Sequence, residues 1–343
     1  MSLRVGIPRA LWYYTYYPFW QTFFTKLGVD CVLSEATTKQ TLDAGIKDAV
    51  SEACVPIKLF FGHISSLRDA WQAGKIDVLF VPRYVSWQAS TVFCPKFLGL
   101  PDMIKHTWEQ MPPIISPRID LRKKPFSLLR ICNNVRRGVG GKLHRFGHAY
   151  VCARIAQWRH EKRLRRNWDP NRSINKQAQV PLQAPSDQTT VRLAVLGYPY
   201  LLHDSYINLG LFDKLHSLGA EVVTAESLQH KHKKPVRHWS KPLFWTYTDM
   251  VARAGVHALG LDADDIDGVI HLTAFACGPD ATVDKLLEIE ARKNNAKPFL
   301  SLCLDEQTGE AGCLTRLEAF VDMLRRQKDQ QAKETAAQPV RQA

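Results

Sequence analysis

The chain has 343 residues, of which 45% are hydrophobic and 23% are charged. This composition supports large buried cores and excludes a chain that is disordered as a whole. The formal net charge is +13, but residues 118–180 hold 17 Lys or Arg against 3 Asp or Glu, which leaves the other 280 residues near −1. The positive charge therefore belongs to one segment and says nothing about the fold as a whole.

The first apolar stretch, residues 10–25, lacks a basic leader and contains Pro18 and Gln21. We expect a core helix there, and neither a signal peptide nor a membrane span. Eight cysteines with no pair at CxxC spacing do not suggest a disulfide framework. A cytoplasmic protein with free thiols is the resulting expectation.

Two parts of the chain show the same succession of patterns. Apolar runs at residues 3–8 and 31–33 flank a helical pattern that ends in Leu-Gly, and runs at 191–199 and 221–224 flank another. Further strand patterns follow at 77–82, 113–115, 268–272 and 298–302. This alternation predicts an internally duplicated α/β chain with two Rossmann-like domains and mostly parallel sheets, joined by a basic helical segment.

The expected domain organisation follows from shifts in composition. An N-terminal α/β domain is expected over residues 1–120 and a C-terminal α/β domain over 191–328. The basic helical segment and a linker fill residues 121–190, because residues 171–190 are rich in Gln, Asn, Pro and Ser. The last residues, 329–343, lack apolar periodicity and are expected to form a flexible tail.

Three cysteines lie where an open α/β sheet places its ligands, near the carboxyl ends of strands. Cys94 and Cys277 follow strand patterns, and Cys54 precedes a helical pattern at residues 57–71. All three are expected at helix N-termini, where backbone amides lower a thiol pKa and favour thiolates that bind soft metals or iron–sulfur clusters. The alternative for each cysteine is a small buried packing residue, and the long spacings form no local metal motif.

Several motifs in one order carry a resemblance to a known family. They are GIPRAL at residues 6–11, YPFW at 17–20, SEACVPIK at 51–58, CPKFLGLPD at 94–102, FACGPD at 275–280 and DEQTGEAG at 305–312. Together they resemble the acyl-CoA dehydratase activase-related, or CoA protein activase, family, which is related to 2-hydroxyacyl-CoA dehydratase subunits. The similarity covers about residues 3–326.

The resemblance implies a pair of Rossmann-like domains whose cysteines hold a [4Fe-4S] cluster, with Cys54, Cys94 and Cys277 as ligands by motif. It also implies low-potential electrons from an ATP-hydrolysing activase of the actin-like ATPase type, used for acyl-CoA reduction or dehydration. The chain has no GxxxxGK[ST] loop, so the ATP-driven step is expected in a separate protein. Two roles stay open within this resemblance: an enzyme component that acts on an acyl-CoA, and a non-catalytic electron relay or scaffold. The basic segment leaves a third role from another class, a basic protein that binds nucleic acid or a membrane surface.

Acidic residues follow the last predicted strand. Glu306 or Glu310 is a candidate fourth iron ligand or general base, since a carboxylate oxygen can complete an open coordination site. The alternative is the start of the final helix, with Thr308 as its cap. Cys303 is a candidate extra ligand or a buried packing thiol.

The remaining candidates are weaker. His203 and Asp204 follow the second-half Gly-Tyr-Pro and are expected either to bind a ligand or to cap a loop. The other four cysteines lie in apolar patterns and are interpreted as packing residues: Cys31, Cys132, Cys152 and Cys313.

Three interpretations of the basic segment compete. It forms a solvated helical face, or a surface for an acidic protein partner such as the activase, or a surface for nucleic acid or an anionic membrane that uses Trp158 and Trp168. No zinc finger, RNP or helix-turn-helix pattern is present, so no specific nucleic acid is predicted.

Overall fold

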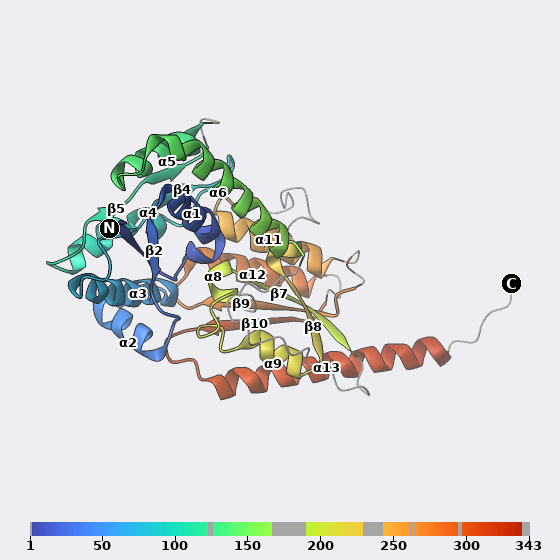
Figure 1. Cartoon of the computed structure of the whole chain (residues 1–343). Coiled ribbons are helices and arrows are strands. Elements are labelled where there is room, and N and C mark those ends of the chain that lie inside the picture. The colour runs from blue at the N-terminus through green and yellow to red at the C-terminus, as the bar shows by residue number, and fades with distance from the viewer. Residues whose placement is uncertain are drawn as a thin grey trace.

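A computed structural model of the chain describes residues 2–122, 126–166, 190–228, 243–260, 263, 265–293 and 297–337. The N-terminal lobe, blue to green in Figure 1, lies beside the C-terminal lobe, yellow to red. Trp168 and almost all of the expected linker lie outside the described residues.

The N-terminal lobe is built on a parallel four-stranded sheet with the order β2-β1-β3-β5. Its strands are β1 (Arg4–Ile7), β2 (Asp30–Leu33), β3 (Val78–Phe80) and β5 (Ile114–Ile115). The predicted first unit is present as β1-α1-β2, where Gly28 ends α1 (Tyr13–Leu27) at a φ of 84°, a backbone conformation that favours glycine.

The C-terminal lobe repeats this arrangement with the order β8-β7-β9-β10, also parallel. Its strands are β7 (Val191–Gly197), β8 (Ala220–Thr224), β9 (Gly268–Ala274) and β10 (Phe299–Leu304). In both lobes the first strand lies between the second and the third, and the fourth is outermost. The predicted α/β class with mostly parallel sheets is therefore confirmed, and the shared strand order agrees with a duplicated chain.

Helices cover both sheets (Figure 1). Those of the N-terminal half are α1, α2 (Lys39–Asp48), α3 (Val55–Gln72), α4 (Pro95–Thr107), α5 (Ser127–Gly138) and α6 (Leu143–Leu164). Those of the C-terminal half are α8 (Pro199–Leu202), α9 (Leu211–Ser217), α10 (Ala225–Leu228), α11 (Thr246–Leu259), α12 (Gly278–Arg292) and α13 (Glu310–Ala337).

A smaller, two-stranded parallel sheet was not predicted. It pairs β4 (Arg83–Ser86) with β6 (Arg118–Asp120), just beyond the ends of β3 and β5. Both strands are short, and arginines occupy exposed or half-buried positions in them, so they lack the apolar run of a central strand. Val85 of β4 accepts a 2.9 Å hydrogen bond from the amide of Phe93, the residue before Cys94.

The predicted core helix is α1, whose aromatic side chains fill the N-terminal core. Trp20 is completely buried, donates a 2.8 Å hydrogen bond to the Tyr84 hydroxyl and packs on Phe80 at a ring-centroid distance of 4.6 Å. The basic helix α6 covers this helix: Gln157 Nε2 donates to the Thr15 carbonyl at 3.0 Å. The basic segment thus packs on the N-terminal lobe as a helical layer.

The final helix, α13, extends into the segment that was expected to form a flexible tail, and it continues through Ala337. Up to Leu324 it packs on the C-terminal sheet through the buried residues Leu317, Val321 and Leu324. The later Gln, Ala, Lys and Glu residues have high intrinsic helix propensity, which needs no apolar periodicity.

Within the described ranges, no helix is long and apolar enough to cross a membrane.

Candidate functional site

The three cysteines predicted at helix N-termini are found there. Cys54 is the residue before α3, Cys94 the residue before α4 and Cys277 the residue before α12. A proline follows each cysteine in the first turn of its helix, where a missing N–H costs no hydrogen bond. Each cysteine therefore lies at a well-defined helix start, with the positive end of the helix dipole beside it.

All three cysteines line one pocket, although they are far apart in sequence and come from both lobes. The pocket encloses about 430 Å³ when solvent at its mouth is included. Six of its sixteen described lining residues are aromatic: Phe93, Phe97, Tyr198, Tyr200, Trp245 and Tyr247. Such a lining keeps water away from the thiols and lowers the local dielectric constant.

Two non-glycine residues beside the pocket have left-handed backbones. Ala276, directly before Cys277, has a φ of 62°, and Leu11 in the pocket wall has a φ of 53°. This conformation is costly for residues with a Cβ, and such strain is concentrated at functional sites. The left-handed backbone at Ala276 turns the chain sharply from β9 into α12 and so places Cys277 at the pocket.

The two lobes are joined beside the cysteines by a short β-bridge. The Val92 amide donates to the Phe244 carbonyl at 2.8 Å, and the Thr246 amide donates back to the Val92 carbonyl at 2.7 Å. Val92 is two residues before Cys94, and Thr246 itself lines the pocket. The position of Cys94 relative to the C-terminal lobe is therefore fixed by backbone hydrogen bonds.

The thiols have unequal proton affinities. The pKa of Cys54 is lowered mainly by a hydrogen bond with the Cys277 thiol, whose effect outweighs that of burial. The charge of Lys96 lowers it further, because Lys96 Nζ lies 4.0 Å from the Cys54 sulfur. The same hydrogen bond and burial raise the pKa of Cys277, and burial raises that of Cys94. Cys54 is thus the first of the three to become a thiolate.

The fit of this site to a metal depends on the kind of metal group. Among the described residues, no set of three or more His, Cys, Asp or Glu is placed to hold a single metal ion. In a cluster, different iron atoms take different thiolates, so the ligands need not converge on one point. Three cysteines, and no carboxylate or histidine, among the described lining residues form a donor set that fits an iron–sulfur cluster and does not fit a single hard ion.

Glu306 lies at the interface of the lobes but outside this lining. Its Oε1 is 2.9 Å from Lys58 Nζ, and the Lys58 side chain is only 6% exposed. The hydrogen bond from Lys58 lowers the pKa of the Glu306 carboxyl. Because Lys58 lies in the first turn and a half of α3, this ion pair ties the Asp-Glu-Gln-Thr-Gly loop to the helix that starts at Cys54.

Glu310 is placed elsewhere. It is the first residue of α13, is 71% exposed and pairs with Lys214 at 2.7 Å. Both residues line a separate, open surface depression. Thr308 was predicted to cap the final helix. Its hydroxyl instead accepts a hydrogen bond from the Asp305 amide and donates one to the Asp305 carboxylate, within the loop before the helix.

The other cysteines do not join the pocket. Cys303 is exposed, so the prediction of a buried thiol is wrong for this residue; alternation along β10 turns its side chain outward while Leu302 and Leu304 are buried. Cys132 and Cys313 are buried, and Cys31 and Cys152 are half-buried, as expected for packing residues.

Asp204 and His203 form internal contacts. The Asp204 carboxylate accepts hydrogen bonds from the Tyr14 hydroxyl at 2.9 Å and from the Thr37 hydroxyl, both of the N-terminal lobe, and from the Tyr206 amide. Burial raises the pKa of Asp204. The nearly buried His203 lies 2.6 Å from Glu226. Asp204 thus combines the predicted loop cap with a link between the lobes.

A buried charge cluster beneath Cys277 was not predicted. His271 of β9 is completely buried, with Nδ1 2.6 Å from Asp284 and Nε2 3.3 Å from Asp280. Burial disfavours the imidazolium, but the attraction of Asp280 and the hydrogen bond with Asp284 outweigh it and raise the pKa of His271 to about 9. The signal in the sequence that could have revealed this cluster is the four-residue spacing of the two aspartates, because that spacing places both on the face of α12 that covers the strand.

Asp280 connects this cluster to the cysteine. It is fully buried in the first turn of α12, and its Oδ2 accepts a 3.4 Å hydrogen bond from the Ala274 amide. Asp280 therefore closes the loop that contains Ala276 and Cys277. The charge cluster holds the start of α12 against β9.

Fold and site define a class of protein: a two-lobed α/β protein with a cysteine-lined pocket between its lobes. A comparison with protein families matched residues 4–228 to the CoA enzyme activase uncharacterised domain (DUF2229). The match covers more than half of the chain, and the chain belongs to this family. A comparison with curated proteins found no match.

Proposed function

We propose that this chain is an iron–sulfur component of an acyl-CoA dehydratase or reductase system. In this proposal Cys54, Cys94 and Cys277 hold a [4Fe-4S] cluster in the pocket between the lobes. The observation that supports it most is the convergence on one pocket of three cysteines separated by up to 223 residues, each at a helix N-terminus. Membership of a CoA enzyme activase family supports the acyl-CoA context.

The residues around the pocket have definable tasks. The hydrogen bond with Cys277 and the nearby Lys96 favour the thiolate at Cys54, as cluster ligation requires. Burial raises the thiol pKa of Cys94 and, with the hydrogen bond to Cys54, that of Cys277, so the positive charge of bound iron would have to deprotonate these two thiols. The aromatic wall excludes water, and the interlobe β-bridge at Val92 keeps Cys94 in place. A cluster bound here would supply one-electron chemistry at low potential. A reducing, cytoplasmic compartment would keep the thiols free.

The geometry favours Glu306 over Glu310 as the candidate fourth iron ligand or general base. Lys58 keeps Glu306 ionised and holds it near the α3 end that starts at Cys54, whereas Glu310 lines a different depression. An ionised, oriented carboxylate can take a proton from a substrate or complete a coordination site. Glu306 is our candidate for that role.

The electron is proposed to come from a separate ATP-hydrolysing activase of the actin-like type. The sequence has no GxxxxGK[ST] loop that would bind ATP phosphates within this chain. A weak electron-transfer encounter needs only a small surface.

A titration separates an enzyme component from a relay. The chemically reduced wild-type protein is mixed under anaerobic conditions with a series of acyl-CoAs, and its electron paramagnetic resonance spectrum is recorded. We expect at least one thioester to change the spectrum, because a substrate that approaches the pocket alters the surroundings of the cluster. Free coenzyme A and a Glu306→Gln variant are the controls. An unchanged spectrum with every thioester would contradict direct catalysis and leave the relay role.

A further inference from the structure

The outward face of α6 carries an exposed apolar stripe. Val151, Ile155 and Trp158 are 54%, 42% and 58% exposed, and their spacing of four and three residues aligns them on one side of the helix. The opposite side, with Ala149 and Ala153, is buried against the N-terminal lobe. One face of the helix is therefore buried on the lobe, and the apolar stripe on the opposite face is not covered by the described residues.

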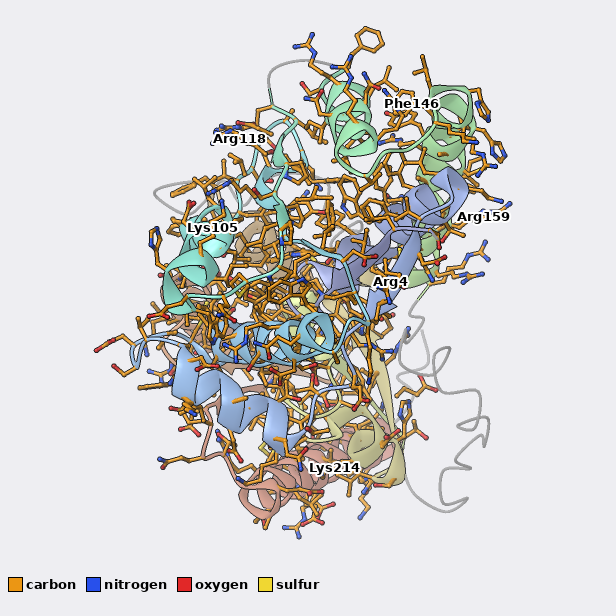
Figure 2. The ribbon with its side chains drawn as sticks, turned by 60° about the vertical axis from the view of Figure 1, so that its left-hand side comes forward. Arg4, Lys105, Arg118, Phe146, Arg159 and Lys214 are labelled. Atoms are coloured by element: carbon orange, nitrogen blue, oxygen red, sulfur yellow. The ribbon has the colours of Figure 1, made fainter. Side chains whose placement is uncertain are left out.

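Basic residues flank this stripe. Residues 126–166 contain eleven Lys or Arg and a single acidic residue, Glu161. On a helical projection Arg154 lies on one side of the stripe and Arg159 on the other, both exposed. Figure 2 shows Arg159 at the outer edge of the molecule. Lys162 Nζ is 5.0 Å from the centre of the Trp158 ring, so a cation and an aromatic ring share this surface.

Two further apolar side chains near this stripe are exposed. Phe126, just before α5, is 74% exposed, and Leu143, the first residue of α6, is 69% exposed. The hairpin formed by α5 and α6 thus exposes large apolar side chains at several points within a strongly basic segment. Apolar side chains flanked by Lys and Arg, with a tryptophan among them, are the arrangement of helices that lie in the plane of a membrane interface.

We propose that the outward face of α6 docks on an anionic lipid bilayer. Val151, Ile155 and Trp158 would enter the boundary between head groups and acyl chains, while Arg154, Arg159 and Lys162 contact lipid phosphates. The charge of the segment is complementary to an anionic leaflet, whose attraction adds to the apolar burial. Valine and isoleucine at the centre of the stripe would gain nothing from the phosphate backbone of a nucleic acid, which favours lipid as the occupant.

Co-sedimentation of the full chain with vesicles tests this surface. One preparation contains phosphatidylcholine alone, and the other contains equal parts of phosphatidylcholine and phosphatidylglycerol. We expect binding to the anionic vesicles only, weakened by high salt because screening shortens the reach of the charges. The triple variant Val151→Ser, Ile155→Ser, Trp158→Ser should reduce the partition coefficient on the order of tenfold, because three buried side chains are lost.

The matched control is Val50→Ser, a substitution at a residue that is 62% exposed on the same lobe but outside the basic segment. It should bind vesicles as the wild type does, and circular dichroism should show that all variants are folded. Absence of binding to the anionic vesicles would overturn the proposal, as would a triple variant that binds them as well as the wild type. Binding of duplex DNA without binding of vesicles would also overturn it, in favour of a nucleic-acid surface.

Discussion

Replacing His271 with alanine is expected to lower the free energy of unfolding by about 3–5 kcal/mol, the usual cost of removing one partner from a buried ion pair. His271 lies between Asp280 and Asp284, and both it and Asp280 are completely buried. The variant leaves Asp280 buried without its cation. Chemical denaturation at pH 6 measures the loss, with the exposed His106→Ala as a control that should change stability by no more than about 0.5 kcal/mol.

The same cluster predicts a dependence of stability on pH. The pKa of His271 is raised to about 9, above its unfolded value of about 6.5. Its contribution is fully present below about pH 6.5, declines as pH rises because the folded state then binds more protons than the unfolded state, and is lost above about pH 9. The decline amounts to something on the order of 3 kcal/mol.

Comparison of two proteins isolates this contribution from other titrating groups. The stability of wild-type protein should fall more steeply between pH 6.5 and 9 than that of His271→Ala. Parallel stability curves for the two proteins, or a variant as stable as the wild type at pH 6, would show that the imidazole is not the charged centre of this cluster.

Gly62→Ala is expected to destabilise the N-terminal lobe by about 3 kcal/mol, the upper part of the range for overpacking. A Cβ at Gly62 in α3 would lie 1.8 Å from the Thr41 carbonyl oxygen of α2, and one at Gly45 in α2 would lie 1.8 Å from the Lys58 carbonyl oxygen of α3. Both neighbours are backbone atoms, so the helices themselves must move apart. The movement would displace the helix that begins at Cys54.

A matched substitution has the opposite sign. Gly147 lies inside α6, and apart from its chain neighbours and the adjacent backbone of the same helix, a Cβ added at this position would meet no heavy atom of the described residues within 4 Å. Gly147→Ala should therefore raise the melting temperature, since alanine favours a helix by about 1 kcal/mol over glycine. Thermal unfolding of both variants checks the pair. A Gly62→Ala protein as stable as the wild type would contradict the close approach of α2 and α3.

Much of the fold could be predicted from the sequence because the central strands are short apolar runs that end in Gly, Pro or polar residues. The apolar runs predicted at residues 191–199 and 268–272 correspond to β7 (Val191–Gly197) and β9 (Gly268–Ala274). The sequence also placed Cys54, Cys94 and Cys277 at helix starts, since each is followed by Pro within two residues. These are local signals, and local structure follows from them directly.

The contacts between distant segments could not be predicted in the same way. The Lys58–Glu306 pair joins residues 248 positions apart, and nothing in either local pattern specifies the other. The pairing of β4 with β6 depends on how the chain continues beyond β3 and β5, because neither strand has an apolar run of its own. The His271 cluster could be predicted only if the packing of α12 over β9 were already known.

The iron and sulfide content of the protein tests the central claim most directly. Wild-type protein and the single variants Cys54→Ala, Cys94→Ala, Cys277→Ala and Cys313→Ala are purified under anaerobic conditions and analysed for iron and acid-labile sulfide per chain. The buried Cys313 lies outside the pocket lining and serves as the matched control.

We predict about four iron and four sulfide per chain in the wild type and in Cys313→Ala, as a [4Fe-4S] cluster requires, and most of both lost in each of the other three variants. Wild-type protein without iron and sulfide, or pocket variants that retain them in full, would contradict the assignment of Cys54, Cys94 and Cys277 as cluster ligands.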